Sequence, residues 1–405
     1  MSEATFFPPK RDPGRPLDPP PELMKWSKEN RVRKVQTWDG TEAWLIMRYE
    51  DVRSALADPG VSADPTLPGF PEKSAAYKEV LGKDRNLRTL DNPEHARHKR
   101  MLIRDFTVKR IGEMKGPIHD RINGQIDEML KKGPPADIFT DLALPIPTMV
   151  ICELLGVPYQ DRDFFADRSQ TAISSDVPAE EASKAGAELN TYIEGLIEKK
   201  QIEPANDLIS RLVHEQMKEG ALTRDEVVNY GRFILIAGHE TTANTIALST
   251  LALLNNPEQR ADLQANQDDD QLVGNAVEEL LRFLSVTHTG RRRVATTELT
   301  FGDTVIPAGS GLIIANSIAD RDCDVFEVPD QPNIRRENAR ANLAFGFGIH
   351  QCLGQLLSRV ELKLVHSTLW RRIPTLELAV PIEELPFHEA GSVYGVKSLP
   401  VTWKA

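Results

Sequence analysis

The sequence contains few cysteines, no long apolar run and no excess of positive charge, and each absence excludes a class of protein. Its 405 residues include only three cysteines, Cys152, Cys323 and Cys352, without any Cys-x-x-Cys pair. Such an odd and widely spaced set forms neither a disulfide framework nor a zinc ribbon, and it suits a reducing compartment. The formal net charge of −11 argues against nucleic-acid binding through bulk electrostatics.

The missing apolar run concerns membranes. No stretch reaches the roughly 18 apolar residues that suggest a spanning helix, and the N-terminal segment lacks the apolar centre of a signal peptide. We therefore expect no membrane anchor and a cytoplasmic location.

The rest of the composition is that of a globular protein, with 40% hydrophobic and 27% charged residues. Helical patterns dominate residues 93–254, whereas segments typical of short strands occur at 43–49, at 290–319 and near the C-terminus. No repeat or clear linker divides the chain. We predict a mainly α protein with a small β region, folded as a single domain over residues 1–405.

The segment "FGFGIHQCLG", residues 345–354, places one cysteine among three glycines. Glycines let the backbone approach a flat ligand, and a helix starting near Leu353 directs its positive end toward a thiolate. These surroundings stabilise an anionic sulfur, as an axial ligand of haem iron requires. A buried, inert cysteine is the alternative, but it explains neither the glycines nor His350. Cys352 and His350 alone do not complete a zinc shell.

This segment resembles the haem-binding signature of the cytochrome P450 family, Phe-x-x-Gly-x-x-x-Cys-x-Gly, which Phe345, Gly348, Cys352 and Gly354 match. The resemblance implies a cytochrome P450 fold, with haem b between the long central helix and the cysteine-loop helix. It implies that Cys352 is the metal ligand, that Phe345 lies against the haem near the sulfur, and that His350 faces a haem propionate.

The long central helix is expected from Thr223 to Leu254, beginning with a Thr-x-x-Glu capping box. Its middle carries "AGHETT", which resembles the family pattern Ala/Gly-Gly-x-Asp/Glu-Thr through Ala237, Gly238, Glu240 and Thr241.

A mid-helix glycine costs about 1 kcal/mol relative to alanine, so Gly238 requires a reason. A glycine near the Thr241 hydroxyl leaves room to bend the helix and to seat water or dioxygen. The alternative is that Thr241 bonds the carbonyl four residues earlier.

Other segments support the resemblance. The pair Glu279-x-x-Arg282 is an ordinary helix pair by itself, but in the family it joins an arginine ahead of the haem segment, here Arg335 or Arg336.

"LDNPEHARHKRML" resembles the helix on the cysteine side of the haem. There His95 matches a propionate ligand, and Lys99 or Arg100 stands in place of a usual arginine. In "RRRVAT", Arg293 matches another propionate arginine.

The function implied by the resemblance is that of a haem-thiolate monooxygenase. Such an enzyme activates O2 and hydroxylates a mostly apolar small organic molecule with electrons from NAD(P)H, delivered by ferredoxin and ferredoxin reductase. Glu240 and Thr241 are the expected catalytic residues, because they would supply the protons that oxygen cleavage needs. We expect a monomer that binds neither nucleic acid nor membrane.

Two other functions stay open at this stage. Several segments resemble fungal haem-thiolate nitric oxide reductases, which take electrons directly from NADH but lack the acid–threonine pair. A non-catalytic haem sensor has no need of that pair either, so Glu240 and Thr241 favour oxygen activation.

The sequence does not identify the substrate. By resemblance, the pocket walls are expected from residues 62–89, 165–185, 236–241, 286–290 and 392–394. We expect the electron donor to dock on a basic cluster comprising Arg97, Lys99, Arg100, Arg104, Lys109 and Arg110.

Overall fold

The computed structural model describes residues 6–74, 85–173, 177–284, 286–388 and 393–404. The chain folds into two units, the first made of Met1–Arg97 and Glu278–Cys352, the second of His98–Val277 and Leu353–Ala405. Two of the boundaries fall inside helices, namely α4 (Glu94–Leu102) and α12 (Asp270–Phe283). The third lies between Cys352 and Leu353, at the end of the cysteine loop.

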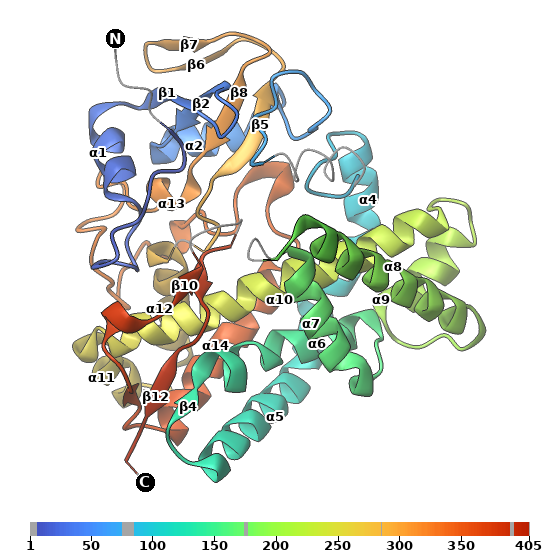
Figure 1. Ribbon diagram of the computed structural model, residues 1–405, viewed down its shortest axis with the longest axis vertical. Coiled ribbons are helices and arrows are strands. Elements are labelled where there is room, and N and C mark those ends of the chain that lie inside the picture. Colours follow the sequence, from blue (N-terminus) through green and yellow to red (C-terminus); the bar gives the residue numbers. More distant parts are fainter. Residues whose placement is uncertain (1–5, 75–84, 174–176, 285, 389–392, 405) are drawn as a thin grey trace. The chain divides into compact units, whose positions relative to one another are not determined.

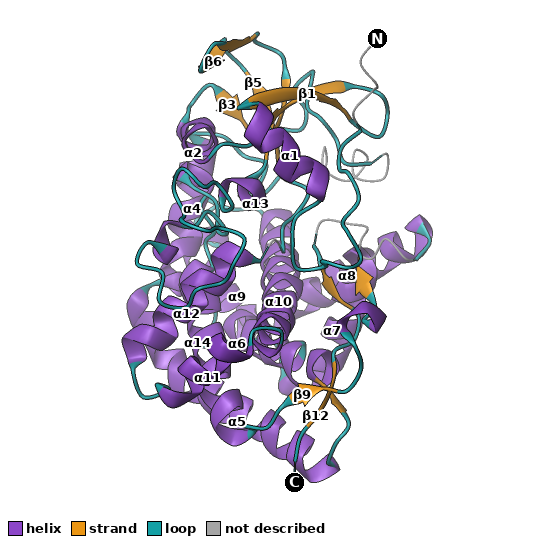
Figure 2. Ribbon diagram, turned by 90° about the vertical axis from the view of Figure 1, so that its left-hand side faces the viewer, coloured by secondary structure: helices purple, strands orange, loops and turns teal. Residues whose placement is uncertain are grey.

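A five-stranded sheet forms the centre of the first unit (Figures 1 and 2). The β2–β8 pair is parallel and the other pairs are antiparallel. In spatial order the strands are β1 (Val32–Gln36), β2 (Glu42–Ile46), β8 (Gly311–Ile314), β5 (Arg291–Ala295) and β3 (Val61–Ser62).

Each face of this sheet buries its own apolar cluster, as the alternation of side chains along a strand requires. Leu45 and Ile313 pack with Leu23 and Trp26 of α1 (Pro21–Glu29). Ile46, Leu312 and Ile314 pack with Val52 and Leu56 of α2 (Tyr49–Ala57). The remaining named elements of this unit are β6 (Leu299–Phe301), β7 (Thr304–Ile306), α13 (Asn316–Ala319) and the 3-10 turns Ala339–Ala341 and Gly348–His350.

The second unit is mostly helical. Its helices are α5 (Val108–Lys132), α6 (Pro145–Leu155), α7 (Arg162–Ile173), α8 (Ala179–Ile202), α9 (Leu208–Arg211), α10 (Arg224–Leu254), α11 (Pro257–Ala265) and α14 (Gln355–Arg372). Its strands form two small sheets, β4 (Ala136–Asp137) with β12 (Pro400–Thr402) and β9 (Glu377–Leu378), and β10 (Phe387–His388) with β11 (Gly395–Val396).

Helix α10 is the longest described helix, and its predicted start is confirmed. The Thr223 hydroxyl accepts from the amide of Glu226, whose carboxylate accepts from the amide of Thr223. The C-terminal half of α10 is buried and packs against α14, where Ser249 Oγ lies 2.8 Å from His366 Nε2. Figure 1 shows α10 (yellow-green) running the length of the helical unit.

Most coarse predictions agree with the structure. Within the stretch 93–254, where helical patterns dominate, residues 208–217 form α9 followed by a π-helical turn at Leu212–Met217. The strand expected at 43–49 ends at Ile46, because Tyr49 already begins α2. The described part of the 62–89 segment is irregular beyond Ser62, and residues 75–84 lie outside the described residues.

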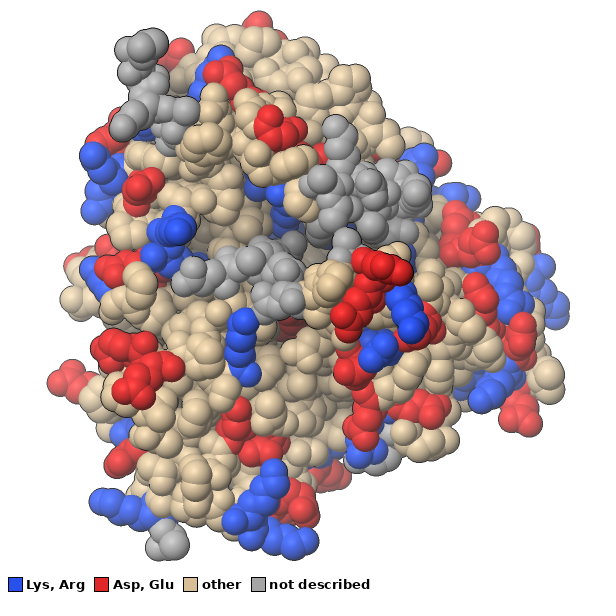
Figure 3. Space-filling model, in the orientation of Figure 1, with Lys and Arg blue, Asp and Glu red and all other residues tan. Residues whose placement is uncertain are grey.

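The surface carries both signs of charge. On the face drawn in Figure 3, acidic and basic side chains are intermingled. Within the described residues, no helix is long and apolar enough to cross a membrane.

Candidate functional site

The cysteine loop is held by backbone hydrogen bonds and by two glycines. The amide of Cys352 donates to the Phe345 carbonyl at 2.9 Å, and the amide of Gly346 donates to Leu343 at 2.8 Å. Gly346 and Gly348 have φ angles of +75° and +70°, which strain residues with a side chain. The loop thus folds back on itself and leaves Cys352 exposed.

The loop also lies against α2. A Cβ atom on Gly348 would lie 2.3 Å from the Leu56 carbonyl oxygen, so only glycine fits there. Gly354 differs, because its φ of −83° is ordinary and, among the described residues, a Cβ atom there would approach only Phe106, at 3.9 Å. Helix α14 begins at Gln355, two residues later than expected.

Strand β5 contributes guanidinium groups. Arg293 is 6% exposed, and its Nη1 donates to the Arg292 carbonyl at 2.7 Å. Burial, together with the smaller effect of the Arg291 charge, lowers the pKa of Arg293 to about 9. Neither Arg291 nor Arg293 forms an ion pair with any residue in the described ranges.

This arrangement fits haem b. An exposed cysteine sulfur suits the iron, and two guanidiniums without acidic partners among the described residues suit the two propionates.

Two histidines lie beside each other in the first unit. His95 is 2% exposed on α4, and its ring centroid is 4.5 Å from that of His350. The Nδ1 of His350 donates to the Leu87 carbonyl at 3.0 Å, and its Nε2 lies 3.9 Å from the Asp91 carboxylate. Burial alone would raise the pKa of Asp91, but His350, Ala63 and Ser62 lower it to about 2.

The basic residues on α4 differ in exposure. Lys99 follows His95 by one helical turn and is partly buried, whereas Arg100 is exposed. Lys99 is therefore the better placed of the two to share a ligand with His95.

A buried ion-pair network shows which of the two candidates, Arg335 or Arg336, joins Glu279 and Arg282. Arg282 bonds both carboxylate oxygens of Glu279, at 2.7 and 2.8 Å. Arg336 Nε joins the same carboxylate at 3.0 Å, whereas the amide of Arg335 turns to Asn333. Glu279 is fully buried, so the network is Glu279–Arg282–Arg336.

The predicted catalytic residues occupy the middle of α10. The hydroxyl of Thr241 donates to the Ala237 carbonyl at 2.6 Å, four residues earlier. A Cβ atom on Gly238 would lie 3.0 Å from Ile151 Cδ1 of α6, so the glycine permits close helix packing. Burial raises the pKa of Glu240 to about 7, and its carboxylate has no hydrogen-bonding partner in the described part of the chain.

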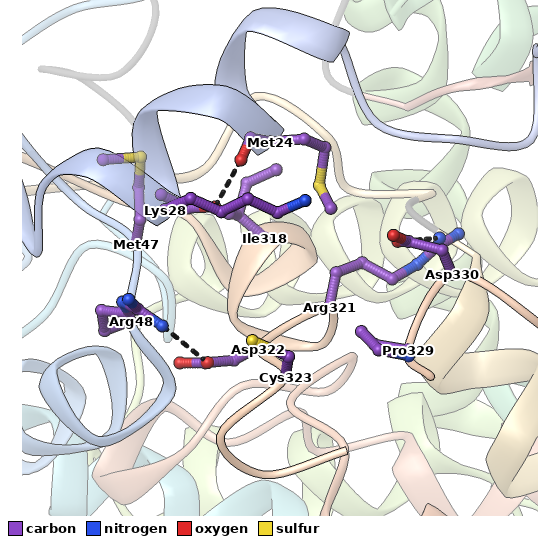
Figure 4. Close-up of a pocket in the computed structure, with 11 residues that line it drawn as sticks. Met24, Lys28, Met47, Arg48, Ile318, Arg321, Asp322, Cys323, Pro329 and Asp330 are labelled. Carbon is purple, nitrogen blue, oxygen red and sulfur yellow. Dashed lines mark hydrogen bonds and ion pairs between the residues drawn. The ribbon is translucent and has the colours of Figure 1, made fainter. Parts of the chain in front are cut away.

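A separate hollow of about 200 Å³ in the first unit contains none of the predicted site residues (Figure 4). Its exposed Cys323 lies between Asp322 and Asp324, a trio whose ligand atoms are close together. Arg48 already pairs with both carboxylates, at 3.0 and 3.1 Å. This neutralisation argues against a metal site.

The predicted site residues divide between the units. The first unit holds Cys352, Phe345, Gly348, His350, His95 and Arg293, and the second holds Lys99, Arg100, Gly354, Ala237, Gly238, Glu240 and Thr241. Of the expected pocket walls, residues 75–84, 174–176 and 392 lie outside the described residues. Arg291 is not among the site residues predicted from the sequence. The run "RRR" on an expected strand nevertheless places Arg291 and Arg293 on one face.

Comparisons with known proteins agree with the resemblance seen in the sequence. A family model described as "Cytochrome P450" matches residues 178–373. The chain is 44% identical over 401 residues to "Cytochrome P450-SU2" from Streptomyces griseolus, covering 99% of this chain and 98% of that protein. It is 44% identical over 372 residues to "Vitamin D3 dihydroxylase" from the same organism, covering 92% and 90%.

The fold is also similar to that of a solved structure. Mycinamicin VIII C21 methyl hydroxylase from Micromonospora griseorubida, bound to mycinamicin VIII, superposes with a TM-score of 0.91 at 39% identity. The match covers 98% of this chain and 100% of that one.

Proposed function

The chain belongs to the cytochrome P450 family, and from that premise we propose that it hydroxylates a mostly apolar small molecule with electrons from separate redox partners. As a member of this family, the chain is a haem b monooxygenase with the cytochrome P450 fold, acting on small organic molecules. The observation that carries this proposal is the Glu240–Thr241 pair on α10, and relatives named as hydroxylases support it. Those relatives do not favour the nitric oxide reductase alternative.

The proposed cofactor contacts follow from the site residues. When bound, haem supplies the iron centre at which dioxygen is activated. Cys352 holds the iron through its sulfur. Phe345, Gly348 and Gly354 shape the loop around it, and Ala237 and Gly238 of α10 are proposed as further haem contacts.

The propionates are proposed to bind Arg293 and His95, with Lys99 in preference to the exposed Arg100. The Nδ1–H of His350 already donates a hydrogen bond to the Leu87 carbonyl. His350 can therefore donate to a propionate only when its Nε2 is also protonated.

Proton delivery is assigned to Glu240 and Thr241. A carboxyl group with a pKa of about 7 gains and loses a proton readily near neutral pH, which suits a relay from solvent. The Thr241 hydroxyl donates its hydrogen bond to the Ala237 carbonyl, so its oxygen can accept a hydrogen bond from water. Glu240 therefore supplies protons, and Thr241 orients the last donor.

The substrate class is inferred from relatives. The names of two of them refer to vitamin D3 and mycinamicin VIII. We propose that this chain likewise accepts an apolar organic molecule.

The electron donor is proposed to be a ferredoxin reduced by a ferredoxin reductase. Within the expected basic cluster, Arg104 pairs with Glu215 and Arg110 with Glu113. Arg100 and Lys109 are exposed and form no ion pair with any described residue. They are the charges available to an acidic donor.

Cytoplasmic action is also proposed, since none of the three cysteines is part of a disulfide and a reducing compartment keeps them as thiols.

Two assays on the haem-loaded enzyme test the function. The first measures oxygen-dependent NADH consumption and hydroxylated product with surrogate ferredoxin and reductase, using ligands chosen from an apolar library by their haem spectral shifts. The second measures NADH-driven nitric oxide reduction without any partner. We expect activity only in the first. Activity only in the second would overturn the proposal.

A further inference from the structure

Strand β5 places three consecutive arginines on two different faces of the sheet. Arg291 pairs in register with Ile314, and Arg293 pairs with Leu312. Both partners belong to the apolar cluster on the α2 side. Arg292 pairs with Ile313, which belongs to the cluster on the α1 side. Arg291 and Arg293 therefore share the face that Arg292 does not.

Arg291 lies directly against the cysteine loop. A Cβ atom on Gly346 would lie 2.9–3.1 Å from three atoms of the Arg291 guanidinium. The positive charge is thus fixed beside the residues that hold the haem iron.

Arg291 has no carboxylate partner among the described residues. Its Nε is buried without a hydrogen-bond partner, and none of those residues pairs with its charge. A partly buried guanidinium without a carboxylate partner is costly to retain, so we expect this one to bind an anion. Cys352 is one candidate anion, but its sulfur serves the iron. The two carboxylates of haem b match two guanidiniums on one strand face.

We propose that Arg291 binds a haem carboxylate beside Arg293, so that β5 contributes two cofactor-binding guanidiniums. The inference rests on haem b as the cofactor and is independent of the substrate and of the electron donor. It assigns to Arg291 a role that the signature segments alone do not indicate.

The test compares holoenzymes carrying Arg291→Gln, Arg291→Lys and the control Arg292→Gln, which removes a buried guanidinium from the opposite face. The first readout is the rate of haem transfer to excess apomyoglobin. The second is the propionate bending mode in the resonance Raman spectrum, which reports hydrogen bonds to the carboxylates. Neither readout depends on catalysis.

We expect Arg291→Gln to speed haem transfer roughly tenfold, the effect of losing one charge-assisted hydrogen bond. The propionate mode should shift in Arg291→Gln, shift less in Arg291→Lys, and stay unchanged in Arg292→Gln.

Faster haem transfer with an unshifted propionate mode would mean that Arg291 only supports the loop, and the proposal would fail. It would fail equally if neither readout changed. If Arg291→Gln does not retain haem, the lysine variant decides, since its altered donor geometry must move the mode if Arg291 bonds the carboxylate.

Discussion

At the residue scale, two threonines on α10 make the same hydrogen bond but differ in their expected role. Thr241 donates to Ala237 at 2.6 Å, and Thr245 donates to Thr241 at 2.7 Å. We expect Thr241→Ala to preserve substrate binding and haem reduction while lowering product per NADH severalfold, with hydrogen peroxide released instead. The reason is that the last proton donor is no longer oriented.

The Thr245→Ala variant is the matched control, because it removes an equivalent backbone-directed hydroxyl one turn further on. It should leave the ratio of product to NADH unchanged. Equal uncoupling in both variants would show that a helix-distorting hydroxyl, rather than a proton-orienting one, matters at Thr241.

Glu361 of α14 is a buried acid with a shifted protonation equilibrium. It is 3% exposed, its Oε2 has no hydrogen-bond partner among the described residues, and burial raises its pKa to about 8 from a usual value of 4.5. Between these values the unfolded state is ionised and the folded state is protonated, so the folded state binds more protons and loses stability as pH rises.

Replacing Glu361 by glutamine should therefore stabilise the protein more at pH 7.5 than at pH 5. The gain in unfolding free energy should be about 3 kcal/mol larger at pH 7.5 than at pH 5. Keeping Glu361 protonated in the folded state costs about two pKa units more at the higher pH, and glutamine removes this cost. Thermal unfolding of the holoenzyme at both pH values measures it, with the exposed Glu258→Gln as control. A stability gain independent of pH would contradict the assigned protonation state.

At the scale of elements, the two motif glycines of the cysteine loop have different physical reasons. Gly348 needs a positive φ and has no room for a Cβ atom, whereas Gly354 has an ordinary φ and open surroundings. We expect Gly348→Ala to lower the fraction of protein that retains haem and to weaken the thiolate-type carbon monoxide spectrum, because the loop must move away from Leu56. Gly354→Ala should keep both near the parent values, and a reversed ranking would refute this reading.

The ends of α10 were predictable because their causes are local. The capping box of Thr223 and Glu226 needs only residues three apart, and Pro257 follows the last turn. The sequence favours a helix bent at Gly238 over a backbone-bonded hydroxyl at Thr241, although both states use the same residues. Only the backbone geometry shows that the hydroxyl bonds Ala237.

The partner of Glu279 could not be predicted, because it depends on how a loop folds over a distant helix. The amide of Asn333 donates to Glu279 at 2.8 Å, which directs the following residues so that Arg336 reaches the carboxylate. Arg335 and Arg336 are the same residue type at adjacent positions, so only the geometry of this loop distinguishes them. In the same way, Arg291 becomes a site candidate only when the strand register places it on the face of the cysteine loop.

At the scale of the whole molecule, net charge and local charge have opposite signs. The protein carries −11 overall, yet Arg100 and Lys109 are exposed without acidic partners among the described residues. Arg100→Glu should slow reduction by an acidic ferredoxin several-fold at low ionic strength, and the loss should shrink with added salt because exposed charges are screened. Stopped-flow reduction of the haem measures it.

Arg104→Glu provides the comparison, since Glu215 already neutralises Arg104. A smaller effect is expected from it than from Arg100→Glu. Identical reduction rates for the parent and Arg100→Glu at low salt would place the donor elsewhere.

The parallel pairing of β2 with β8 has a consequence for biosynthesis. β2 ends at Ile46 and β8 begins at Gly311, so about 265 residues must be translated between them. At roughly 5–20 residues per second, the β1–β2 hairpin waits roughly 15–50 s for its partner strand, with one edge open on the ribosome. Recovery of folded enzyme from cells should therefore depend on chaperone supply and growth temperature more than on the stability of the finished protein.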